Sequence, residues 1–219
     1  MMRERTSRVL FAYWNEVRGE RMAPRRFDIE PARISEVLSE TFILEREEGT
    51  TRFRLAGTRI VEQLGHELRG IALEDLWADS DRRRLDTILA SVVEQGGVGL
   101  VHFTAASPPE DGIEPRSAAF EMLLLPLVHT EGTVTRILGA ISNSAPPHWL
   151  GAVPLPDRTI DSAMVIWPDG RPHSAIEAAD RQAPFKPGYA AARIVRFDRR
   201  QFRVFDGGLD AGRSDRSEK

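Results

Sequence analysis

The chain has 219 residues, no cysteine and a formal net charge of −3 at pH 7. The absence of cysteine excludes disulfides, thiolate metal sites and cysteine nucleophiles. The net negative charge argues against a general nucleic-acid-binding protein. No apolar run approaches the ~18 residues of a membrane-spanning helix, and the start of the chain has no signal-peptide pattern. We therefore expect a cytoplasmic protein with neither nucleic acid nor membrane as a partner.

The first predicted element is an amphipathic helix over residues 6–18. Its apolar side chains recur at helical spacing and form one stripe, made of Leu10, Tyr13, Trp14 and Val17. Two aromatic side chains on so short a helix favour burial by about 1.5–3 kcal/mol each. We therefore expect this helix to cover an apolar surface. A basic connector follows it.

The next ~75 residues are predicted to alternate between strands and short helices. In chain order the pattern indicates a short helix opened by Pro31, strands at 41–47 and 51–56, helical turns at 59–64 and 73–77, and a longer helix capped by Asp79-Ser80-Asp81 and ended by Gly96-Gly97. A third strand is predicted at 99–105.

Residues 117–142 contain two apolar runs on either side of a polar segment with Gly132, which predicts a hairpin. In the first run Phe120, Met122 and Leu124 should face one way, while Ala119, Leu123 and Leu125 face the other. Because both faces are apolar, the sheet should be covered on both sides. The domain's own helices would form one cover, and the first helix is our candidate for the other.

This order predicts an α+β fold: a five-stranded antiparallel sheet with helices on one face and an N-terminal amphipathic helix. We divide the chain into an N-terminal helix and connector (1–30), the central domain (31–145) and a C-terminal extension (146–219). The extension is expected to be partly disordered, with a weak strand pair at 193–197 and 201–205.

The enclosed face of the sheet is the predicted ligand-binding site. Its candidate residues are Leu55, Trp77, Phe103 and Met122 as apolar lining, with Arg59 and His66 to orient a ligand. An interior that is wholly apolar would instead be a packed core. The five histidines form no pair with metal-ligand spacing, and no nucleophile elbow or phosphate loop is present, so we expect neither a metal site nor an enzyme.

Several short motifs fit one known family. They are Tyr13-Trp14, Pro24 in the connector, Phe53-Arg54-Leu55-Ala56-Gly57-Thr58-Arg59, Gly65-His66-Glu67-Leu68-Arg69-Gly70, Glu74-Asp75-Leu76-Trp77, Glu121-Met122-Leu123-Leu124-Leu125-Pro126-Leu127 and Arg203-Val204-Phe205-Asp206-Gly207-Gly208. With these motifs the chain resembles the PAS fold, and more narrowly a family of small bacterial stand-alone PAS-domain proteins.

The resemblance implies sensing or signalling through a small-molecule ligand or a protein partner, usually as a homodimer. It names no cofactor. Because cysteine is absent, the cysteine-dependent flavin and yellow-protein chromophore mechanisms are excluded. His66, between two glycines, is predicted to lie in a loop and not in the helix that haem-binding relatives use. The chain after the domain is too short for a kinase or cyclase domain, so output would pass through a signalling partner. The alternatives are a ligand-free adaptor that acts through protein contacts and an enzyme of unrecognised type.

Overall fold

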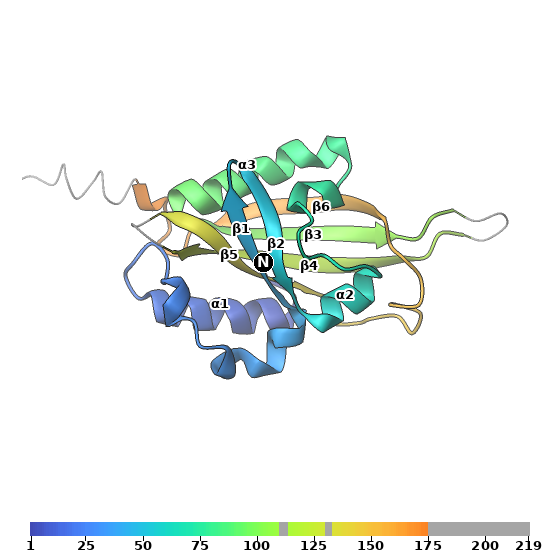
Figure 1. Cartoon of the computed structure of the whole chain (residues 1–219), viewed down its shortest axis with the longest axis horizontal. Coiled ribbons are helices and arrows are strands. Elements are labelled where there is room, and N and C mark those ends of the chain that lie inside the picture. Colours follow the sequence, from blue (N-terminus) through green and yellow to red (C-terminus); the bar gives the residue numbers. More distant parts are fainter. Residues whose placement is uncertain (110–113, 130–132, 175–219) are drawn as a thin grey trace, which may run out of the picture. The chain divides into compact units, whose positions relative to one another are not determined.

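The computed structural model describes residues 1–109, 114–129 and 133–174, which belong to one compact unit. Its elements, drawn in Figure 1, are α1 (Arg5–Arg18), η1 (Arg26–Asp28), η2 (Pro31–Glu40), β1 (Thr41–Glu47), β2 (Thr50–Ala56), α2 (Thr58–Leu64), η3 (Leu73–Leu76), α3 (Asp79–Gln95), β3 (Val98–Ala106), β4 (Ser117–Val128), β5 (Val134–Ser142) and β6 (Asp157–Ile166). The predicted turn at Gly132 and the predicted strand pair at 193–197 and 201–205 lie outside the described residues, as does most of the predicted extension. None of the described helices combines the length and apolar character that crossing a membrane requires.

The strands form one antiparallel sheet in the order β2-β1-β5-β4-β3-β6. The five predicted strands are all present, but the predicted total of five is wrong, because β6 adds a sixth within the described residues. β6 pairs with β3 from end to end, so the sheet continues past the predicted domain end at residue 145. Most β6 side chains are exposed or half-buried, as on an edge strand, and the segment therefore lacks the apolar run that marks the other strands.

One face of the sheet, called here the inner face, is covered by α2, η3 and α3. Phe120, Met122 and Leu124 of β4 belong to this core together with Val101 and Phe103 of β3. The prediction that Phe120, Met122 and Leu124 face one way is therefore confirmed.

The opposite, outer face is covered by α1 and η2 of the same chain. Leu10, Tyr13 and Trp14 of α1 pack with Leu123 and Leu125 of β4 in a second buried cluster. Figure 1 shows α1 and α3 on opposite sides of the sheet. The predicted role of the first helix as a cover is confirmed, and the cover comes from within one chain.

The edge strand β6 is attached to α3 through its main chain. The amide of Ile160 donates to Oδ2 of Asp81 over 2.9 Å, and Nη1 of Arg84 donates to the carbonyl of Ile160 over 2.9 Å. The prediction that Asp79-Ser80-Asp81 caps α3 is wrong, since the N-cap residue is Ala78 and no side chain caps it. Asp81 instead binds an edge strand whose backbone groups would otherwise lack partners.

Candidate ligand-binding site

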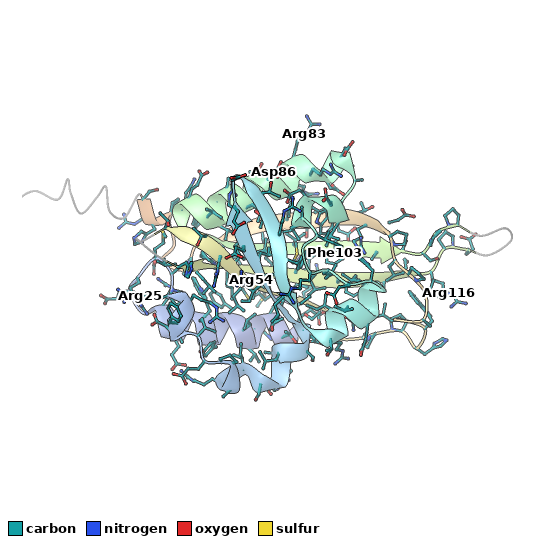
Figure 2. The ribbon with its side chains drawn as sticks, viewed as in Figure 1. Arg25, Arg54, Arg83, Asp86, Phe103 and Arg116 are labelled. Carbon is teal, nitrogen blue, oxygen red and sulfur yellow. The ribbon has the colours of Figure 1, made fainter. Side chains whose placement is uncertain are left out.

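Three of the six predicted site residues meet at the inner face of the sheet. The ring of Trp77 lies edge-on to Phe103, with centroids 5.0 Å apart and planes at 81°. Phe103 in turn stacks on its cross-strand partner Phe120, with centroids 5.2 Å apart. Met122 belongs to the same buried cluster. Figure 2 labels Phe103 over the strands of the sheet. These side chains form a close-packed aromatic wall.

The indole N–H of Trp77 is the first unusual feature of this wall. Trp77 is only 3 % exposed, and its Nε1 atom has no acceptor among the residues the structure describes. A buried indole N–H normally finds a hydrogen-bond partner, because leaving it unpaired costs free energy. The wall therefore presents an unused donor.

Arg158, at the start of β6, is the second unusual feature of this region. It pairs with Ala105 of β3 and faces the inner side, as does Ile160 two residues further on. Its exposure is 7 %. Only Nη1 has acceptors, the carbonyls of Leu76 and Pro156, each at a long 3.4 Å. Nε and Nη2 are buried without an acceptor in the described part of the chain.

The charge of Arg158 also has no ion-pair partner among the described residues. No carboxylate oxygen of the described residues lies within 4.0 Å of its guanidinium nitrogens, the distance that defines an ion pair. Burial lowers the pKa of this guanidinium, against a weaker opposing effect of the neighbouring Asp157. An arginine nevertheless stays protonated in proteins, so the charge persists in a place that disfavours it.

The two features are linked through η3. The carbonyl of Leu76, the last residue of η3, contacts Arg158, and Trp77 follows directly in the chain. All the unpaired groups on these two residues are donors. Such a set of donors is suited to bind an oxygen-bearing, negatively charged group.

Leu55, predicted to line the enclosed side, lies elsewhere and is 55 % exposed. The pairing of β1 with β2 contains a bulge: Leu44 faces Phe53 and Ile43 faces Leu55, so Arg54 is the extra residue. A bulge inverts the alternation beyond it, which turns Leu55 to the outer face while Phe53 stays in the inner core. The predicted placement of Leu55 is therefore wrong.

Arg59 and His66 also lie away from the aromatic wall. The half-exposed guanidinium of Arg59 pairs with Glu40 over 3.3 Å at a polar hollow of about 250 Å³. His66 lies in the predicted loop after α2, where Nδ1 is 3.1 Å from the carbonyl of Leu64. The structure thus does not bring these two side chains together with Trp77.

A separate hollow of about 550 Å³ opens between the connector after α1, the end of α3 and the β4–β5 hairpin. It is lined by Met22, Val93, Val128 and Val134 among others, and by none of the predicted site residues. Among the described residues, no group of three or more His, Asp or Glu side chains is placed to hold a metal ion.

Arg158 was missed by the sequence reasoning because its segment was assigned to the C-terminal extension. The one available signal is local: Arg158 and Ile160 alternate with Thr159 and Asp161, the period-2 pattern of a strand. That pattern is too short to place an arginine on a buried face.

Comparison with known protein families finds a match over most of the described chain. Residues 2–142 match the model of a PAS domain family, which spans α1 to the end of β5 and stops before β6. Among curated proteins no match to the chain is found.

Proposed function

The chain belongs to the PAS domain family, and on that premise we propose that it is a sensory module that binds a small molecule at the inner face of its sheet. PAS domains are generally sensory or signalling modules. The bound state would be passed to a signalling protein partner. In this proposal the protein works by binding and not by catalysis, and it works as a homodimer.

The observation that carries the proposal is the group of unpaired donors beside the aromatic wall. Trp77 and Arg158 are both buried, and Nε1 of one and Nε and Nη2 of the other lack acceptors among the described residues. A purely structural core avoids such groups, because each costs stability. Unsatisfied buried groups in an otherwise apolar region favour a ligand that completes them.

A ligand-free adaptor is the second candidate, and a different observation favours it. Trp77, Phe103 and Met122 are packed against one another in the continuous inner core. At the same time Phe27 and Leu55 expose 80 % and 55 % of their surfaces, which offers apolar contacts to a partner protein.

Native mass spectrometry of the freshly purified full chain separates the two. An adduct mass that dissociates on mild activation, reproduced in independent preparations, supports the sensor. A clean mass of the bare chain in every preparation contradicts it and supports the adaptor. Denaturing mass spectrometry of the same sample is the control for covalent modification.

A further inference from the structure

We propose that Arg158 anchors the ligand and that the ligand therefore carries an anionic oxygen group, a carboxylate or a phosphate. This inference rests on the proposed sensory function and names the chemical class that the site would take. Arg158 lies on β6, outside the residues that match the family, so the anchor is a feature of this chain's own sheet edge.

The guanidinium of Arg158 keeps its positive charge when it is buried. A guanidinium cannot escape burial by losing its proton, so a buried arginine needs an anion or a dense set of acceptors. Arg158 has two backbone carbonyls at 3.4 Å and no carboxylate partner in the described part of the chain. Asp157, the adjacent carboxylate in the chain, acts on Arg158 electrostatically but forms no ion pair with it, and the Asp81 carboxylate is hydrogen-bonded to the main chain of β6. The counter-charge is therefore expected from a bound group.

The guanidinium atoms of Arg158 that have no acceptor in the described chain lie along one edge of its plane, away from Nη1. Nε and Nη2, the two atoms without acceptors, form one edge of the planar guanidinium and present two N–H groups side by side. This is the edge that binds both oxygens of a carboxylate, or two oxygens of a phosphate, at once. Nη1, on the other side, holds the head in place through Leu76 and Pro156. The free edge is thus a preoriented fork.

The inner face around Arg158 is aromatic and apolar. Trp77 offers one more unpaired N–H and an aromatic surface, while Phe103 and Ile160 supply apolar contacts on the same face. Because this face is closely packed and Nε and Nη2 are themselves buried, the anionic group reaches the fork only when neighbouring side chains at the start of β6 move aside.

The experiment measures the thermal unfolding midpoint of the full chain in sodium acetate and in sodium phosphate, against sodium chloride at the same ionic strength. We expect a saturable rise of the midpoint in at least one oxyanion, and the arm that responds distinguishes a carboxylate from a phosphate site. Arg158→Met should abolish the rise. Arg158→Lys, which keeps the charge but loses the fork, should shift half-saturation to at least tenfold higher concentration.

Arg83→Met is the matched control, since Arg83 is exposed on α3 and points away from the sheet in Figure 2. It should respond as the original chain does. In chloride alone Arg158→Met should unfold at the same temperature as the original chain or higher, because a buried charge without an ion-pair partner has been removed. If Arg158→Met does not fold, Arg158→Lys alone decides the outcome through its altered half-saturation.

If the oxyanion raises the unfolding midpoint equally in the original chain and in both Arg158 variants, the proposal that Arg158 anchors the ligand is overturned. An unresponsive original chain together with an Arg158→Met variant that is less stable in chloride would also overturn it, since Arg158 would then be paired within the chain. A small-molecule adduct that persists in Arg158→Met by native mass spectrometry would overturn the anchor and leave the sensory function standing. A bare mass with no oxyanion response contradicts both.

Discussion

Nε2 of His102 lies 2.9 Å from Oε2 of Glu121, and this buried pair ties the start of α1 to the outer face of the sheet. Glu121 is 1 % exposed, and its two oxygens also accept the main-chain amides of Arg3 at 2.7 Å and Glu4 at 3.2 Å. Nδ1 of His102 is 2.9 Å from the hydroxyl of Ser162 on β6. One carboxylate thus joins β3, β4 and the residues before α1, with β6 attached through the histidine.

Replacing Glu121 by glutamine should loosen this junction. The glutamine amide turns one accepting oxygen into a donor, which then faces another donor in a buried site. We expect a loss of about 1–3 kcal/mol in the free energy of unfolding, measured by urea denaturation. Faster amide hydrogen exchange in residues 3–10 should accompany it. Glu62→Gln, on the exposed side of α2, is the control. Unchanged stability and unchanged exchange would show that the carboxylate does not hold α1.

The two buried tryptophans should respond differently to the same substitution. The indole N–H of Trp14 donates to the carbonyl of Pro126 over 2.9 Å, whereas that of Trp77 has no acceptor among the described residues. Trp14→Phe therefore leaves a buried carbonyl unpaired, and Trp77→Phe removes an unpaired donor. We expect Trp14→Phe to cost at least about 1 kcal/mol more than Trp77→Phe. Chemical denaturation of the two variants measures the difference, and equal losses would contradict the distinction.

Glu45 should make the stability of the sheet depend on pH. Burial raises the pKa of its carboxyl, but hydrogen bonds from Arg136 on β5 and Arg54 on β2 outweigh burial, so the pKa lies below its ordinary 4.5. Figure 2 labels Arg54 on its strand. A carboxyl whose pKa is lower in the folded state stabilises that state above the unfolded-state pKa and stops doing so as pH falls through the folded-state pKa.

The test compares urea midpoints of the original chain and Glu45→Gln from pH 7 to pH 3. The original chain should be more stable at pH 7, and the gap should narrow as pH falls below 4.5. Glu47→Gln, at the exposed end of β1, should show little difference at any pH. A gap that stays constant down to pH 3 would contradict the assignment.

The two-sided sheet could be predicted because period-2 alternation is explicit where both faces are apolar. In β4, Met122 and Leu123 are adjacent, equally apolar and oppositely directed, and each lies in the cluster that the alternation assigns to it. The stripe of α1 has the matching helical period. Because the apolar stripe of α1 and the outer side of β4 both need burial, each element is the expected packing partner of the other.

The positions of Leu55 and Arg158 could not be predicted from the local residue pattern. The bulge before Leu55 is set by how β2 pairs with β1, and no residue pattern in β2 alone specifies it. Arg158 lies on an edge strand, where pairing with β3 and bonds from α3 replace an apolar run as the reason for folding. The part of the candidate site that carries charge therefore depends on long-range pairing.

Deleting residues 1–19 should remove α1 from the outer cover and leave only η2 on that face. Leu10 and Trp14 are fully buried against the sheet, and without them Leu123 and Leu125 would face water as part of a continuous apolar patch. Exposed patches of this kind favour association. We expect the truncated chain to aggregate or to change its oligomeric state, and the full chain to sediment as a homodimer in analytical ultracentrifugation.

Two substitutions within α1 separate loss of the cover from loss of the segment. Leu10→Asp places a charge in the buried stripe and should reproduce the behaviour of the deletion, because an unpaired carboxylate cannot remain in that contact. Ala12→Asp adds the same charge on the exposed side of the helix and should sediment as the full chain does. Identical, well-behaved monomers for the full and truncated chains would contradict both the cover and the homodimer. A full-length monomer beside an aggregating truncation would contradict the homodimer alone, because α1 then serves only its own sheet.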